Sequence, residues 1–272
     1  MKQRVVSSLI MLPLLAVVFV GGRLLLAACF LIGVAGMREF FRSFERAVAL
    51  RGKSRGAHPS RAIAYAAAVG LYCIDLFAPD KSALYMLWFF LAAALSLLYP
   101  LDANRRRIED GMVTLTGILY ICFFSYHVAL LGQLPRYERM VWLIFLAAFG
   151  TDIAAFFTGS LIGRHKLCPA ISPGKTTEGA VGGFLGSVLF CGAFGYLLMP
   201  ALLAHCLILG AIGGVVSQLG DLTASVFKRG LGIKDYGNLI PGHGGILDRF
   251  DSVLFTAPVV YYYTVLVIPM TV

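Results

Sequence analysis

Residues 82–99, SALYMLWFFLAAALSLLY, decide the fold, because they form a long apolar stretch without a single charged side chain. A helix of about 20 such residues is long enough to cross the hydrocarbon core of a bilayer. The whole chain has the same character: 59% of its 272 residues are hydrophobic, 14% are charged, and the mean hydropathy is +0.82. Soluble domains have about 45–50% apolar and about 25% charged residues. The composition therefore excludes a soluble or disordered protein and predicts an all-α bundle of membrane helices.

Similar apolar stretches recur along the chain at intervals that fit membrane helices. We predict nine spans, at residues 5–21, 22–37, 62–78, 82–99, 111–132, 140–163, 179–198, 201–220 and 252–271. The first is interpreted as a retained helix, since a second apolar run follows at once and no small-residue cleavage site stands out. Without a linker or a charged tail, residues 1–272 are expected to form a single integral domain.

The distribution of positive charge predicts the orientation. With the N-terminus in the cytoplasm, 19 of the 23 Lys and Arg residues fall on the cytoplasmic side and 4 on the other. This asymmetry matches the positive-inside rule. The net charge of +9 then reflects membrane orientation and gives no reason to expect nucleic acid as a partner.

One basic segment, residues 37–61, belongs to the N-terminal helices, which we place at 1–138. It is predicted to be helical, with arginines on one stripe (Arg38, Arg42, Arg46) and apolar residues on another (Phe40, Phe41, Phe44, Val48), because residues four apart share a helix face. Such a helix can lie in the membrane interface and attract anionic lipid headgroups. A solvated basic connector explains the segment equally well.

Carboxylates inside apolar spans are costly and therefore informative. Asp152 lies in the middle of the sixth predicted span and Asp221 closes the eighth, whereas Asp75 falls near the end of the third. One interpretation is an ion-coupled transporter that uses Asp75, Asp152 and Asp221. The absence of an obvious internal repeat weakens that interpretation.

The polar residues of the C-terminal half, 139–272, concentrate in two predicted cytoplasmic loops. Residues 221–251, DLTASVFKRGLGIKDYGNLIPGHGGILDRFD, combine four aspartates with basic residues and glycines. Carboxylate oxygens suit Mg²⁺, and Lys and Arg suit phosphate. Residues 164–178 add Ser172, Lys175 and Thr176 as phosphate ligands. Together the two loops indicate metal-assisted phosphoryl chemistry.

These same residues carry a resemblance to a known family. SVFKR at 225–229, KD at 234–235 and PGHGGILDRFD at 241–251 resemble the signature of the phosphatidate cytidylyltransferases, the CDP-diacylglycerol synthases. Asp152, RHKL at 164–167 and ISPGKTTEG at 171–179 are similar to a second block of the same family. The resemblance implies transfer of CMP from CTP to phosphatidic acid, with CDP-diacylglycerol and pyrophosphate as products. It also implies Mg²⁺, with a monovalent cation such as K⁺ beside it, and a homodimer.

Carried over by position, the resemblance implies two metal ligands and Lys175 as a phosphate-binding residue, and the charged and polar residues of the two loops complete the expected site. Asp221 and Asp248 are the expected metal ligands, with Asp152 and Asp251 as further candidates. The catalytic set is Asp221, Asp248, Lys175 and Arg249, and the substrate-binding set is Ser172, Lys175, Thr176, Lys228, Arg229, Asn238 and His243. Nine spans without an N-terminal extension are typical of a bacterial protein, so we expect the inner membrane, with the site facing the cytoplasm.

Two positions depart from the family pattern. The family usually has SPKKT, whereas Gly174 replaces the first of those lysines here. The family usually has a tyrosine where this chain has Phe156. The first change removes one expected lysine contact in this loop, and the second removes any function of a phenol there.

Overall fold

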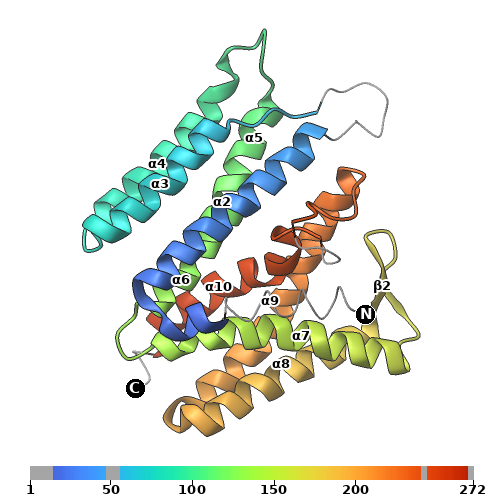
Figure 1. The fold of residues 1–272 in the computed structure, drawn as a ribbon. Helices are drawn as coiled ribbons and strands as arrows, with labels where there is room; N and C mark the ends of the chain where they lie inside the picture. Colours follow the sequence, from blue (N-terminus) through green and yellow to red (C-terminus); the bar gives the residue numbers. More distant parts are fainter. Residues whose placement is uncertain (1–14, 47–55, 240–243, 269–272) are drawn as a thin grey trace. The chain divides into compact units, whose positions relative to one another are not determined.

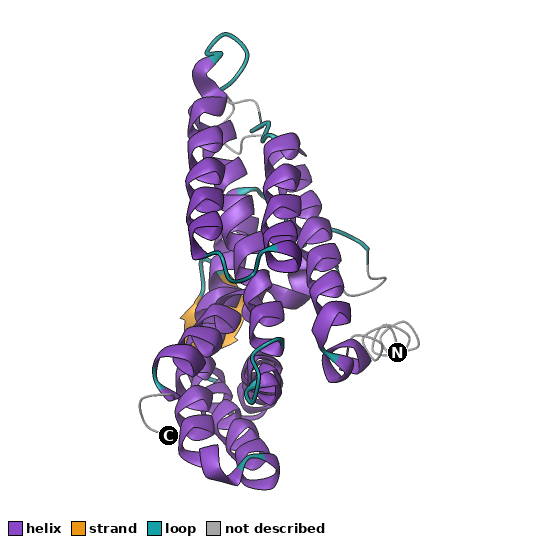
Figure 2. Cartoon of the chain, turned by 90° about the vertical axis from the view of Figure 1, so that its left-hand side faces the viewer, coloured by secondary structure: helices purple, strands orange, loops and turns teal. Residues whose placement is uncertain are grey.

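The computed structural model describes residues 15–46, 56–239 and 244–268. Over these residues the all-α prediction is confirmed: the chain forms the helices α2 to α10 (Figure 1). Apart from these helices, the described chain has one two-stranded sheet, drawn in orange in Figure 2. The prediction of a single domain over 1–272 is not tested by these observations.

The described chain divides into two compact units, which are treated separately below. The first contains Arg23–Tyr126 and Gly230–Arg249, and the second contains Val18–Gly22, His127–Arg229 and the chain from Phe250 onward. Each unit is therefore discontinuous in sequence.

Helices of the N-terminal half build most of the first unit. They are α2 (Gly22–Arg46), α3 (Arg61–Phe77), α4 (Ser82–Leu98), the short helix η1 (Tyr99–Leu101), α5 (Ile108–Thr116), the π-helical segment η2 (Gly117–Phe123) and the start of α6 (Phe124–Gly132). In Figure 1, α3 and α4 run side by side in opposite directions. Phe40 and Phe41 of α2 are fully buried in the core of this unit. The ring of Phe41 occupies the space that a side chain at Gly117 would need, so α2 and η2 pack closely.

The second unit is built around a close pair of helices. It contains η3 (Glu138–Met140), α7 (Val141–Ile162), β1 (Lys166–Cys168), β2 (Ser172–Thr176), α8 (Thr177–Leu198), η4 (Pro200–Leu202), α9 (Leu203–Gly230) and most of α10 (Leu247–Leu266). Helices α7 and α8 lie side by side in Figure 1. Their buried faces meet through glycines, as described below for the pocket.

Six helices are long and apolar enough to cross a membrane, counting only the described residues. They are Gly22–Arg46, Ser82–Leu101, Ile108–Gly132, Glu138–Ile162, Thr177–Leu198 and Pro200–Gly230. Six of the nine predicted spans correspond to these helices, and two more correspond to α3 and α10. The first predicted span, 5–21, lies largely outside the described residues. The chain is a multi-pass membrane protein, and the count of nine spans and the cytoplasmic N-terminus stay predictions.

Three predicted boundaries differ from the structure. The segment 37–61 does not form one helix, because α2 continues to Arg46 and residues 56–60 connect to α3 without helical structure. The arginines Arg38, Arg42 and Arg46 are exposed as expected, whereas Val48 lies outside the described residues. The segment 164–178 contains a β-hairpin. The segment 221–251 is loop only in its middle, since α9 extends to Gly230 and α10 begins at Leu247.

Candidate functional site

A β-hairpin between α7 and α8 carries the lysine of the predicted site. Strands β1 and β2 pair antiparallel, with Lys166 opposite Thr176 and Cys168 opposite Ser172. Lys175 therefore lies on the second strand, one residue before Thr176, whose hydroxyl oxygen accepts the backbone N–H of Gly179 at 3.1 Å and so caps α8. Side-chain caps of this kind satisfy one of the free N–H groups of a helix start. Thr176, predicted as a substrate ligand, thus has a structural contact as well.

The base of the hairpin is closed by Glu178. Its carboxylate accepts the backbone N–H groups of Arg164 at 3.1 Å and His165 at 3.2 Å, and it lies 2.6 Å from the His165 ring nitrogen Nδ1. The Glu178 side chain, which follows β2, thereby binds the two residues that precede β1. This contact fixes the strand that bears Lys175 to the first turn of α8.

Glycines set the distance between α7 and α8. A side chain at Gly179 would meet the backbone oxygen of Ala155 at 2.9 Å, and one at Gly183 would meet that of Thr151 at 2.9 Å. A side chain at Gly182 would overlap Thr158 of α7. Small residues at such spacing let helix backbones approach closely in membranes. These glycines therefore allow the close packing of α7 and α8.

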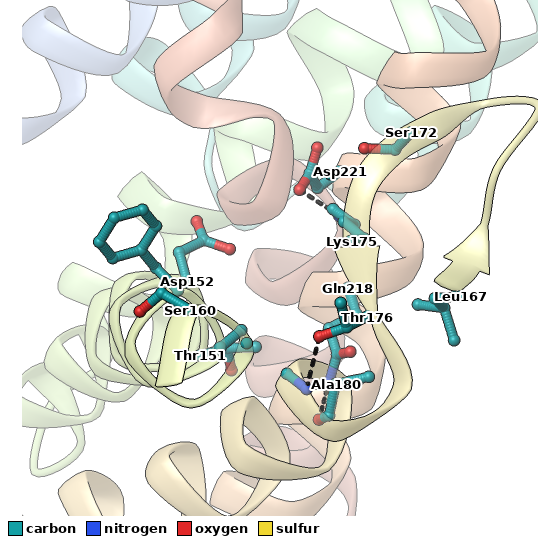
Figure 3. A pocket seen from close by; sticks show the side chains of 15 residues that line it. Thr151, Asp152, Ser160, Leu167, Ser172, Lys175, Thr176, Ala180, Gln218 and Asp221 are labelled. Carbon is teal, nitrogen blue, oxygen red and sulfur yellow. Dashed lines mark hydrogen bonds and ion pairs between the residues drawn. The ribbon is translucent and has the colours of Figure 1, made fainter. Parts of the chain in front are cut away.

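A cavity of about 490 Å³ opens between α7, the hairpin, α8 and α9, all within the second unit. Its polar lining includes Asp152, Ser160, Ser172, Lys175, Gln218 and Asp221. Figure 3 shows that Asp152 points its carboxylate from α7 into the cavity, while Lys175 and Asp221 face it from the other side. Five predicted site residues are thus brought together at one place: Asp152, Ser172, Lys175, Thr176 and Asp221.

Each charged side chain named at this cavity has a charged or polar partner. The ammonium group of Lys175 forms an ion pair with the carboxylate of Asp221, and both side chains are about a quarter exposed. The hydroxyl of Ser252 donates to Asp152 at 3.3 Å. The cavity thus places a basic group and two carboxylates next to a polar, water-accessible space.

Three further predicted residues lie on α9 and α10 in the same unit. Lys228 and Asp251 are both buried, and their charged atoms are 3.9 Å apart. Asp251 also interacts electrostatically with Asp221 and Asp152. The guanidinium of Arg229 donates to the backbone oxygen of Ile171 at 3.0 Å, so it ties the end of α9 to the hairpin.

The rest of the predicted site belongs to the first unit. The Oδ2 atom of Asp248 accepts the backbone N–H groups of Tyr236 at 2.8 Å and Gly245 at 3.0 Å, and Asp248 is buried. The Nε atom of Arg249 is buried and has no hydrogen-bond partner within the described residues. Asn238 is exposed, and His243 lies outside the described residues. The predicted pairing of Asp221 with Asp248 joins residues of different units and stays a prediction.

The oxygen ligands of the cavity suit a hard cation. Mg²⁺ usually binds one or two carboxylates and completes its shell with water and substrate phosphates. Asp221 and Asp152 supply such oxygens at one cavity. Among the described residues, no group of three or more His, Cys, Asp or Glu side chains is arranged to hold a metal by itself. Two carboxylates beside a polar cavity fit a hard cation whose other ligands are water and phosphate oxygens.

Two polar residues of these regions were not predicted from the sequence. Gln218 donates its side-chain N–H groups to the backbone oxygens of Ala180 at 3.1 Å and Gly214 at 3.0 Å, so its amide is held at the cavity wall. Glu39 of α2 accepts the backbone N–H of Leu247 at 3.0 Å in the first unit. The only sequence signal for either was a polar residue in or near an apolar span.

Asp75, the first carboxylate of the transporter interpretation, is bound by a side chain of its own unit. It is buried in the first unit and accepts a hydrogen bond from the hydroxyl of Tyr126. Asp221, the second carboxylate of the transporter interpretation, is paired with Lys175. Neither contact favours an ion-coupling function.

Comparisons with known proteins place the whole chain in a family. The chain is 33% identical to a phosphatidate cytidylyltransferase of Synechocystis sp., over 98% of each chain, and 36% identical to one of Pseudomonas aeruginosa, over 95% of each chain. It is 38% identical to a phosphatidate cytidylyltransferase of Bacillus subtilis, over 57% of this chain and 58% of that one. The sequence model of the cytidylyltransferase family matches residues 2–267, which is nearly the whole chain, and the protein therefore belongs to the cytidylyltransferase family.

Proposed function

We propose that this protein is a phosphatidate cytidylyltransferase, which transfers CMP from CTP to phosphatidic acid and releases CDP-diacylglycerol and pyrophosphate. The observation that carries the proposal is the similarity to two proteins of that name along at least 95% of each chain. The cavity supports it, because it brings Lys175 and Asp221 together beside a space large enough for part of a nucleotide.

The reaction joins two anionic substrates. An oxygen of the lipid phosphate attacks the α-phosphorus of CTP, a new P–O bond forms, and the bond to the bridging oxygen of the β-phosphate breaks. Pyrophosphate takes the electron pair of that bond. The attacking phosphate is anionic near pH 7, so no strong general base is required. The main obstacle is repulsion between the substrates, which positive groups in the site must reduce.

Basic side chains meet this requirement. Lys175 lines the cavity and can exchange its contact with Asp221 for a phosphate oxygen. Ser172 lies on the same strand and can donate its hydroxyl to phosphate. Lys228, Arg229 and Arg249 are the further cations of the signature, and the unpaired Nε of Arg249 within the described residues suits an anionic partner. Asn238 and His243 remain candidates for orienting a substrate.

The donor chemistry of the site suits Mg²⁺. Asp221 would hold it, with Asp248 as the second proposed ligand and Asp152 and Asp251 as further candidates. When bound, the ion would neutralise charge on the phosphates. A monovalent cation such as K⁺ and a homodimer are parts of the same proposal, which rest on the family resemblance. We also propose that the site faces the cytoplasm of a bacterial inner membrane, because 19 of the 23 Lys and Arg residues fall on that side of the predicted topology.

The direct test is an incorporation assay on the purified protein in detergent. It follows label from [α-³²P]CTP into the organic phase, with and without phosphatidic acid, and with Mg²⁺ or EDTA. We expect incorporation only when phosphatidic acid and Mg²⁺ are both present. A folded protein that transfers no label under any of these conditions would overturn the proposal, and gradient-independent turnover would exclude the transporter interpretation.

A further inference from the structure

Helix α2 contains two acidic residues, Glu39 and Glu45. Among the contacts of the described residues, Glu39 binds the start of α10, whereas Glu45 pairs with Arg61. Its Oε2 atom accepts the backbone N–H of Leu247 at 3.0 Å, and Ile246 adds a second backbone hydrogen bond. Leu247 is the first residue of α10 and the neighbour of Asp248. A carboxylate at this place satisfies free N–H groups of the helix start and is favoured by the helix dipole.

The segment before α10 is shaped around this carboxylate. A side chain at Gly237 would lie 2.5 Å from the Oε1 atom of Glu39, and one at Gly245 would overlap the same carboxylate. Because both positions are glycine, there is space for the Glu39 carboxylate. A side chain at either position would occupy that space. The carboxylate therefore lies close against the backbone at both glycines.

A second set of contacts joins α2 to the carboxylate of Asp248. Ser43, one turn after Glu39, donates its hydroxyl to the backbone oxygen of Tyr236 at 3.2 Å. The Tyr236 ring packs on Phe40, with ring centres 6.0 Å apart, and its backbone N–H donates to Asp248 at 2.8 Å. Asp248 is thus held on one side through Tyr236 and on the other through the helix start that Glu39 caps. All of these residues belong to the first unit.

We infer that Glu39 is a positioning residue, which orients the carboxylate of Asp248 for Mg²⁺ by holding the start of α10 against α2. The inference rests on the proposed function, in which Asp248 is a metal ligand. Glu39 itself contacts neither substrate nor metal. Residues that orient a metal ligand typically contribute about 10–100-fold to metal affinity.

The test compares Glu39→Ala and Glu39→Gln with Glu45→Ala and Glu45→Gln. Glu45 is a matched control, because it lies on the same helix and pairs with Arg61 away from α10. The first readout is the Mg²⁺ concentration that gives half-maximal incorporation. We expect Glu39→Ala to raise it at least about 10-fold and Glu39→Gln about 3-fold, since the amide keeps one acceptor, while both Glu45 variants stay within about 2-fold of the wild type.

The second readout is independent of activity. Hydrogen exchange of the metal-free protein in detergent should show faster exchange of the Leu247 and Tyr236 amides in Glu39→Ala than in Glu45→Ala. If Glu39→Ala does not fold, Glu39→Gln serves as the test variant. A Mg²⁺ requirement equal to that of the wild type in Glu39→Gln would then overturn the inference. Equal Mg²⁺ requirements and equal exchange in the Glu39 and Glu45 variants would overturn it as well. A wild type without incorporation activity would instead overturn the proposed function, and the exchange data would still report on the contact.

Discussion

Asp221→Asn is the sharpest single test of the cavity as a reaction site. The substitution keeps the size and shape of the side chain and removes its negative charge. In the structure this carboxylate pairs with Lys175 and receives a long hydrogen bond of 3.5 Å from Ser225. Both members of the ion pair are partly exposed, so losing the pair should cost about 1 kcal/mol of stability or less.

The expected effect on the rate is much larger. Removing one group that stabilises charge in a transition state typically lowers kcat by about 10²–10³. We therefore expect Asp221→Asn to lose at least a hundredfold in incorporation of labelled CTP, while the thermal unfolding midpoint in detergent changes little. Glu109→Gln is the control, because this exposed carboxylate pairs with Arg107 at 2.7 Å and lies outside the cavity. Turnover of Asp221→Asn within about threefold of the control would refute our assignment of this carboxylate.

Two further predictions concern the elements that shape the cavity. Glu178→Ala should raise the KM for CTP more than it lowers kcat, because the hairpin loses the acceptor that holds Arg164 and His165. Glu178→Gln should restore much of the affinity for CTP, because the amide keeps an acceptor. Equal kinetics of the two variants would contradict this prediction. Gly182→Val should lower the free energy of unfolding in detergent by about 1–3 kcal/mol, because its side chain would overlap Thr158 of α7. Gly174→Ala is the control and should leave the stability unchanged, because a side chain there would meet nothing within 4 Å. A Gly182→Val protein as stable as the wild type would contradict the described packing of α7 and α8.

The sequence was most informative where a pattern is repeated or chemically unusual. Long apolar runs predicted the helices, because the bilayer demands about 20 apolar residues of each span. Asp152 and Asp221 stood out because carboxylates in or beside apolar spans are costly, and Lys175 stood out as a basic residue in a loop rich in hydroxyl groups. The structure brings these three residues to one cavity.

The elements that were missed depend on contacts that are distant in the chain or too short to form a pattern. Strands of three and five residues are too short to show alternation, and Pro173 lies within the second of them, so the hairpin was taken for a loop. The end of α9 was placed ten residues too early, since its last turns are polar and nothing in them breaks a helix before Gly230. Glu39 gave only the weak signal of a polar residue near an apolar span, and its partner Leu247 is 208 positions away.

The contact between Glu39 and Leu247 has a consequence for how the nascent protein is assembled. The first unit receives its last segment, Gly230–Arg249, only after more than a hundred residues of the second unit have been synthesised. During translation α2 therefore enters the membrane with a carboxylate whose backbone partners do not yet exist. Until those partners emerge from the ribosome, Glu39 must be held by water, lipid headgroups or the insertion machinery. Expressing the two halves of the gene as separate polypeptides would divide the first unit itself, and the N-terminal fragment would lack the backbone partner of Glu39.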